Sequence, residues 1–184
     1  SDMSGVVAIS DAIPTMGAMA SLNISFNQMA TKEAGKALAD ALAANSTLKE
    51  LDVSKNTDRG DGYANFDGAD GPGFAKELAI GVGANGALVK FDISENGLFA
   101  AGAKAVAEAL KGNKIMTELN ISSNYLGWKN GNGASDTSGV IAISNAIPTM
   151  GALAKLDVSN NSIPNDQQAD LKGICTSKSI GLAL

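Results

Sequence analysis

The residues LKELDVSKN, Leu48–Asn56, set the architecture of the chain, because four other stretches repeat their pattern. Apolar side chains occupy positions 1, 4 and 6, a Ser occupies position 7, and an Asn closes the pattern at position 9. The other copies are MASLNISFN at 19–27, LVKFDISEN at 88–96, MTELNISSN at 116–124 and LAKLDVSNN at 153–161. This alternation predicts a short strand in which positions 4 and 6 face a core, while positions 3, 5 and 7 face outward.

Helical periodicity precedes the copies of this pattern. Counting back 3, 4, 7, 8 and 11 residues from Asn45 or Asn113 gives small and apolar residues, the spacing of one α-helix face. The same count from Met16 and Met150 also gives apolar faces, whereas the count from Asn85 includes a Gly and a Glu. Each repeat therefore combines a strand, a loop and a helix, and the repeats must stack to bury their apolar sides. We expect the Ala and Gly residues of each helix to allow close approach to the sheet.

Parallel strands stack about 4.8 Å apart, and helices are wider than strands, so the stack must curve with its sheet on the concave side. The repeats resemble leucine-rich repeats of the ribonuclease-inhibitor-like class, which carry a full helix on the convex side. Asn-to-Asn spacings of 29 and 28 residues suit that class, and spacings of 40 and 37 indicate insertions. The expected fold is an α/β right-handed solenoid, a leucine-rich repeat arc. The resemblance implies a protein-binding scaffold, with Ran GTPase-activating proteins as a rare member that assists catalysis.

The chain is expected to form a single domain, residues 1–184, of about five repeats with insertions at 57–73 and 125–138. A longer periodicity relates SDMSGVVAISDAIPTMG at 1–17 to SDTSGVIAISNAIPTMG at 135–151. Because the second copy follows an insertion loop, we expect the chain to be a fragment of a longer array. Near the carboxyl end, Ile174 and Ile180 resemble a shortened sixth unit. Exposed ends of such a stack would favour end-to-end self-association.

Charge and composition exclude several classes of function. The chain carries 14 basic and 19 acidic residues, a net charge of −5, which argues against binding to nucleic acid. It has no His, so triads that use imidazole as a base are excluded, and its single Cys excludes an internal disulfide framework. No apolar run approaches the roughly 20 residues of a membrane span. We therefore expect a cytoplasmic protein that is not an enzyme, holds no cofactor or metal, and binds a protein.

Position 5 of the pattern supplies candidate binding residues on the concave face. Asp and Asn form strands poorly, yet the position reads Asn23, Asp52, Asp92, Asn120 and Asp157. Asp52 and Asp92 are expected to be cross-strand neighbours, whose repulsion Lys90, Lys155 or Lys55 would relieve. Position 3 alternates in charge through Glu50, Lys90, Glu118 and Lys155. The face is either a solvated, self-neutralising surface or a binding surface on which Asp52, Asp92 and Asp157 select a basic partner.

The two insertions supply a second set of candidate binding residues. Both are rich in Gly, Asp and Asn, and they contain four of the eight aromatic residues of the chain: Tyr63, Phe66, Tyr125 and Trp128. Tyr and Trp are enriched among the residues that dominate binding energy at interfaces. Both insertions follow a strand, so we expect them to leave the same edge of the sheet and to form one surface. The alternative is that these aromatic residues pack beneath their own loops.

Other interpretations of the first insertion carry less weight. Its four Asp residues suggest calcium, but their spacing does not fit an EF-hand loop: Asp58, Asp61, Asp67 and Asp70. Residues 59–61 spell Arg-Gly-Asp, an integrin-type tripeptide that conflicts with the expected compartment. Arg59 is also the only Arg of the chain, and its position suggests a GTPase-activating module as an alternative function. A purely structural repeat segment is the remaining alternative.

Overall fold

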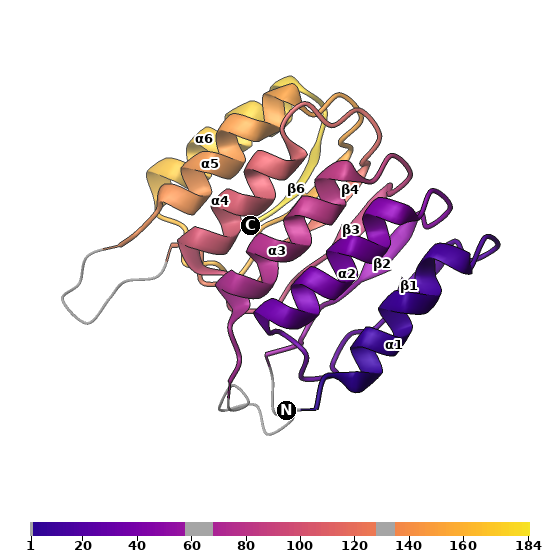
Figure 1. Cartoon of the computed structure of the whole chain (residues 1–184). Helices are drawn as coiled ribbons and strands as arrows, with labels where there is room; N and C mark the ends of the chain where they lie inside the picture. The colour runs from indigo at the N-terminus through magenta and orange to yellow at the C-terminus, as the bar shows by residue number, and fades with distance from the viewer. Residues whose placement is uncertain (1, 58–67, 128–134) are drawn as a thin grey trace.

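The computed structural model describes residues 2–57, 68–127 and 135–184. Helices and strands alternate along these residues (Figure 1). The helices are α1 (Ser4–Ala12), α2 (Lys32–Ala44), α3 (Gly71–Ala84), α4 (Phe99–Leu110), α5 (Ser138–Ala146) and α6 (Asn165–Ser177), with short 3-10 turns η1 (Ile13–Thr15) and η2 (Ile147–Thr149). The strands are β1 (Ser21–Asn23), β2 (Glu50–Asp52), β3 (Lys90–Asp92), β4 (Glu118–Asn120), β5 (Lys155–Asp157) and β6 (Gly181–Ala183).

The strands form one open parallel sheet in the order β1-β2-β3-β4-β5-β6, and the helices pack side by side over one face of it (Figure 1). The five pattern copies pair in register, so that Leu51 lies opposite Phe91 and Phe91 opposite Leu119. The expected α/β solenoid is confirmed. The sheet continues beyond the fifth copy, because β6 pairs with β5 through Leu182 and Leu156. None of the described helices is long and apolar enough to cross a membrane.

The core lies between the sheet and the helices. Positions 1, 4 and 6 of the complete inner repeats are buried, as Leu48, Leu51 and Val53 illustrate. Position 7 differs from the expectation, because Ser54 and Ser94 are buried rather than outward-facing. The reason is that each strand ends at position 5, where the chain begins to turn, so the two-residue alternation no longer applies.

Glycines set the separation of neighbouring helices rather than the separation of helix and sheet. A Cβ on Gly81 of α3 would lie 2.4 Å from the Cα of Ala39 in α2. A Cβ on Gly139 of α5 would lie 2.8 Å from the Cα of Ala100 in α4. The expectation that small residues bring helices close to the sheet is therefore incomplete, because at these positions the contact is with the adjacent helix. Gly81, which weakens the predicted helical face, is required for that contact.

The Asn at position 9 links each repeat to the next. The side-chain Oδ1 of Asn96 accepts a hydrogen bond from the backbone N–H of Asn56, and Asn124 Oδ1 accepts one from Asn96 N–H. The Nδ2 of Asn96 donates to the carbonyl oxygens of Val53 and Ile93, at 2.9 and 3.1 Å. Buried backbone groups need such partners wherever the chain leaves a regular element. The structural interpretation of this Asn column is confirmed, with Asn56, Asn96 and Asn124 fully buried.

A second Asn position ends the helices of the inner repeats. Asn45 Oδ1 accepts hydrogen bonds from the backbone N–H groups of Thr47 and Leu48, while its Nδ2 donates to the carbonyl of Ile13. Asn85 repeats the arrangement and donates to the carbonyls of Leu42 and Asn45. Each side chain thus directs the turn from helix to strand and also contacts the preceding repeat.

Candidate functional site

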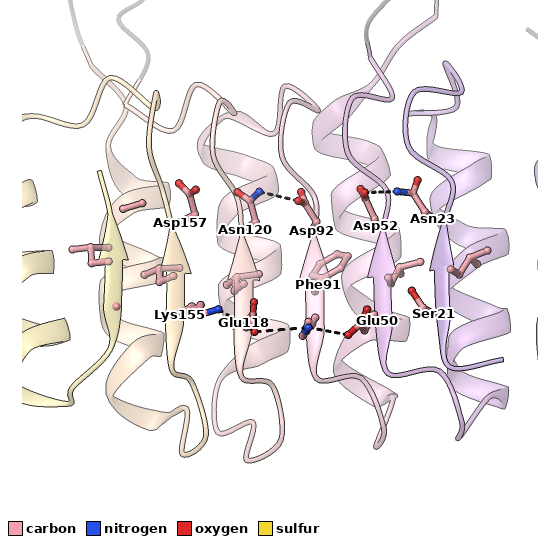
Figure 2. Close-up of a pocket in the computed structure, with 18 residues that line it drawn as sticks. Ser21, Asn23, Glu50, Asp52, Phe91, Asp92, Glu118, Asn120, Lys155 and Asp157 are labelled. Atoms are coloured by element: carbon pink, nitrogen blue, oxygen red, sulfur yellow. Dashed lines mark hydrogen bonds and ion pairs between the residues drawn. The ribbon is translucent and has the colours of Figure 1, made fainter. Parts of the chain in front are cut away.

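A groove of about 740 Å³ runs across the concave face of the sheet and is lined by residues of all six strands (Figure 2). Two rows of outward side chains cross this groove at right angles to the strands. The position-3 row comprises Ser21, Glu50, Lys90, Glu118, Lys155 and Gly181. The position-5 row comprises Asn23, Asp52, Asp92, Asn120, Asp157 and Ala183.

The position-3 row is a chain of ion pairs. Lys90 Nζ lies 2.9 Å from Glu50 Oε1 and 3.9 Å from Glu118 Oε1, and Lys155 Nζ lies 3.4 Å from Glu118 Oε1. The hydrogen bond and charge of Lys90 lower the pKa of Glu50, and Glu50 in turn raises the pKa of Lys90. The charges along this row alternate as predicted, and each pairs with an opposite charge on a neighbouring strand. Because two Glu face two Lys, the row carries no net charge.

The position-5 row explains why Asp and Asn occupy a strand position. Asp52 Oδ1 accepts a hydrogen bond from the backbone N–H of Ser54, and Asp92 Oδ1 accepts one from Ser94. Asp157, Asn23 and Asn120 make the same bond two residues ahead. These side chains stabilise the turn that ends each strand, which offsets their poor strand propensity.

The second carboxylate oxygens show how the Asp pair is accommodated. Asp52 and Asp92 are cross-strand neighbours, as predicted. Each turns its Oδ2 away from the other and toward an Asn, at 2.8 Å from Asn23 Nδ2 and 2.8 Å from Asn120 Nδ2 (Figure 2). The expected relief by lysines does not occur in this form, because Lys90 and Lys155 pair with glutamates of the other row and Lys55 pairs with Glu95. Amide donors on the strands that flank this pair, β1 and β4, take their place.

Asp157 differs from the other two carboxylates of the row. Its Oδ1 accepts from the backbone and side chain of Ser159, at 2.9 and 2.7 Å. The residue paired with it on β6 is Ala183, which has no side-chain donor. Within the described part of the chain, Asp157 Oδ2 makes no hydrogen bond, unlike the Oδ2 atoms of Asp52 and Asp92. With three Asp and no cation, the position-5 row gives the groove a formal charge of −3.

Of the predicted aromatic residues, only Tyr125 lies within the described part of the chain. It is exposed and stacks on Phe99, with ring centroids 5.4 Å apart and an angle of 21° between the ring planes. Phe99 was not among the predicted residues, because it lies outside both insertions. The hydrogen bond from Phe99 N–H to Asn124 O places it beside residue 125. Tyr63, Phe66 and Trp128 lie outside the described residues.

The other interpretations of the first insertion concern residues of which little is described. Asp70 caps α3 by accepting a hydrogen bond from Gly73 N–H at 2.8 Å. Arg59, Asp58, Asp61 and Asp67 lie outside the described residues. Among residues 2–57, 68–127 and 135–184, no cluster of three acidic or Cys side chains has the geometry of a metal site.

Comparison with known proteins finds a matching repeat and two similar folds. A family model described as "Leucine Rich repeat" matches residues 44–57. A solved structure titled "Leiomodin-1 Actin-Binding Site 2 (ABS2)" is similar at a TM-score of 0.68 and 16% identity, covering 96% of this chain and 88% of that one. The tropomodulin C-terminal domain of Caenorhabditis elegans is similar at a TM-score of 0.64 and 11% identity, with 93% and 91% covered. No curated protein sequence matches the chain.

The matched residues contain the last residue of α2, the strand β2 and Asn56, which is the strand portion of one repeat. The two structural likenesses extend the same arrangement over nearly the whole chain. By its repeat match and its fold, the chain has the architecture of a leucine-rich repeat solenoid.

Proposed function

We propose that the chain is a non-enzymatic protein-binding scaffold whose concave groove receives a basic segment of its partner. The observation that carries this proposal is the charge distribution of the groove, in which one row is neutralised internally and the other keeps three carboxylates. The turns that Asp52, Asp92 and Asp157 stabilise use Oδ1, and Asn would serve that purpose equally. The additional charge therefore suits recognition of a cation-bearing partner.

The aromatic residues of the insertions form the second part of the proposal. The stacked pair of Tyr125 and Phe99 offers exposed apolar area at the edge where the strands end. Tyr63, Phe66 and Trp128 are proposed as further anchors on the strength of their residue types alone. A partner that crosses the groove would contact both the position-5 carboxylates and the aromatic pair at the edge. The carboxylates would select for charge, and the aromatic residues would provide apolar anchoring.

Likeness to the leiomodin structure makes actin the first protein to test as a partner. The likeness supports the scaffold role in general, because at 16% identity it concerns the fold rather than individual contact residues. The buried free thiol of Cys175 supports a reducing compartment, and we propose the cytoplasm.

The proposal is tested with two probes, monomeric actin and a 15-residue peptide of alternating Lys and Ser. We expect at least one probe to bind, and the variant Asp52→Asn, Asp92→Asn, Asp157→Asn to weaken its binding about tenfold at low salt. Stability should fall by about 1–3 kcal/mol, because Asn preserves the Oδ1 hydrogen bonds to Ser54, Ser94 and Ser159 but cannot accept from Asn23 and Asn120 as the Oδ2 atoms of Asp52 and Asp92 do.

A matched control removes three negative charges elsewhere. Asp11, Asp40 and Asp170 are exposed on α1, α2 and α6, and their replacement by Asn changes the net charge by the same amount. This control should bind like the unmodified chain. Equal losses in the two variants would reduce the effect to total charge and contradict a site in the groove. Failure of both probes to bind the unmodified chain would also count against the proposal.

A further inference from the structure

The chain contains two nearly identical segments in different surroundings. Residues 1–17 and 135–151 differ at only three of their 17 positions, and they lie 134 residues apart in sequence. The first segment forms α1 and η1 at one end of the helix layer, beside α2 (Figure 1). The second forms α5 and η2, between α4 and α6. Because the sequences match, any difference in burial between them reports what covers α5 and not α1.

The difference is confined to one side of the helix. Ile143 of α5 is 3% exposed, whereas the corresponding Ile9 of α1 is 39% exposed. Met150 is 4% exposed and its counterpart Met16 is 41% exposed. On the outer face, Ile141 and its counterpart Val7 are both exposed, at 50% and 43%. The segment 1–17 thus carries an apolar side suited to a neighbour that α4 provides in the second copy.

The glycines locate that neighbour. Gly139 approaches α4 so closely that an added Cβ would lie 2.8 Å from Ala100 Cα and 2.9 Å from Ala103 Cβ. At the corresponding Gly5, nothing lies within 4 Å. Ile143 and Ile9 each follow their glycine by one helical turn, so glycine and isoleucine share a face in both helices. At Gly139 the absence of a side chain allows α4 to approach closely, whereas the equivalent space beside Gly5 is open.

The residues that follow α5 also make polar contacts with the segment that follows α4. Thr149 Oγ1 accepts a hydrogen bond from Gly112 N–H, and the Thr149 carbonyl accepts one from Lys114 Nζ at 2.9 Å. Gly151 N–H donates to the carbonyl of Asn113. In the first copy the corresponding Gly17 N–H turns back to Thr15 O instead. The segment that follows α4 therefore forms hydrogen bonds with Thr149 and Gly151. The first copy carries the same residue types, as Thr15 and Gly17.

We propose that the face formed by α1, Met16 and the edge strand β1 docks a further leucine-rich repeat with the chemistry of residues 99–117. Such a unit has small residues where Ala100 and Ala103 lie and a Lys where Lys114 lies. A cavity of about 200 Å³ at this face, lined in part by Met3, Ile9, Ile24 and Met29, provides the apolar contact area. The neighbouring edge strand β1 offers backbone groups for parallel pairing, as β4 offers them to β5.

The opposite end of a second copy fits this face less well. Its helix α6 exposes Asp166, Asp170 and Lys172, and only three residues separate α6 from β6. The corresponding connection from α4 to β4 contains seven residues, including Lys114, which contacts η2, and Asn113, which contacts Gly151. A repeat of the α4 type is therefore the better occupant, and self-association through α6 becomes an alternative outcome of the test.

The test supplies a neighbour of the α4 type from the chain itself. Residues 71–134 are fused directly before Ser1, so that Ala134 meets Ser1 as it meets Ser135 in the native sequence. Ile9→Cys is introduced into the chain and into the fusion, and the rate of thiol labelling is measured. Cys175 gives little background, because it is buried and burial raises the pKa of its thiol. Docking should slow labelling at position 9 at least about tenfold.

Two controls make the result specific. Val7→Cys should label equally fast in both proteins, because its counterpart Ile141 stays exposed beside α4. Gly5→Leu should restore fast labelling at position 9 in the fusion, while the melting temperature of the unfused Gly5→Leu variant does not fall. If the added segment shows no gain in helical signal, a fusion carrying residues 1–134 before Ser1 replaces it, and the same rates are compared.

Equal labelling of Ile9→Cys in the chain and in a folded fusion would overturn the proposal. Slower labelling at positions 7 and 9 alike would also overturn it, because the outer face of α1 should remain open. Protection of Ile9→Cys in the unfused chain that grows with protein concentration would assign the face to a second copy and so overturn the choice of occupant. None of these readouts depends on partner binding in the groove, so this inference and the proposed function fail separately.

Discussion

Asparagine is costly to bury because each amide carries two donors and an acceptor that lose their contact with water. Asn56, Asn96 and Asn124 are fully buried in this chain, and each uses both ends of its amide. At Asn96, one oxygen accepts from the repeat before it while one nitrogen donates to carbonyls of two strands. A single side chain therefore joins backbone groups of two successive repeats.

Replacing Asn96 by Ala should lower the free energy of unfolding by about 1–3 kcal/mol, because the buried N–H of Asn56 loses its partner, while the carbonyls of Val53 and Ile93 each keep an amide donor from Asn56 or Asn124. Asn27→Ala is the matched control: Asn27 is exposed and donates only to Ser25 O, so its loss should cost less than about 1 kcal/mol. Urea unfolding followed by circular dichroism measures both values. A small effect at Asn96 would contradict the hydrogen-bond account of the column.

The residue before each of these asparagines adopts a left-handed backbone conformation. The φ angles are +57° at Lys55, +55° at Glu95 and +54° at Ser123. This region costs a non-glycine residue about 1–2 kcal/mol. Ser123→Gly should therefore raise the free energy of unfolding by about 0.5–1 kcal/mol after the added chain entropy of Gly is counted, whereas Ser123→Ala should not. The denaturation midpoints of the three proteins decide the point.

Helices of this array pack against one another as closely as their glycines allow. Gly81 lies within a helix, where Ala is normally the better residue, yet its Cβ position is occupied by the backbone of Ala39. The helix is thus shaped by its neighbour rather than by its own propensity.

Gly81→Ala should lower the free energy of unfolding by about 1–3 kcal/mol, because α2 and α3 must move apart. Gly173→Ala in α6 makes the same chemical change at an exposed position with nothing within 4 Å, and it should stabilise the chain by about 0.5–1 kcal/mol. Thermal melting of both variants gives the two signs. Stabilisation at Gly81 would show that the helices have room to spare.

In the whole molecule, the nearly identical segments 1–17 and 135–151 allow one sequence to be compared in two surroundings. We expect amide hydrogens of α1 to exchange at least about tenfold faster than those of α5, because α1 has a helix on one side only. Hydrogen exchange resolved to peptides 4–12 and 138–146 measures the ratio without any mutation. Equal protection would mean that sequence, and not stacking, fixes the stability of these helices.

The repeat pattern allowed much of this architecture to be predicted. The strands, their register and the pairing of Asp52 with Asp92 follow from five aligned copies, because stacking forces like positions together. The left-handed turns and the stacking of Phe99 on Tyr125 were not predictable, since both depend on the path of the chain between elements. The sequence predicted which face of the sheet carries the candidate site, but not its hydrogen bonds. That Asp52 uses one oxygen for a turn and the other for Asn23 is visible only in the structure.

The asparagine column also gives the array a direction. Each amide oxygen holds the backbone of the repeat before it, so Asn161 secures Asn124, which secures Asn96. Both partners of the bond between Asn56 and Asn96 and of the bond between Asn96 and Asn124 belong to fully buried residues. A defect at one asparagine should therefore be transmitted to the repeat on its amino-terminal side, whose backbone N–H loses its acceptor.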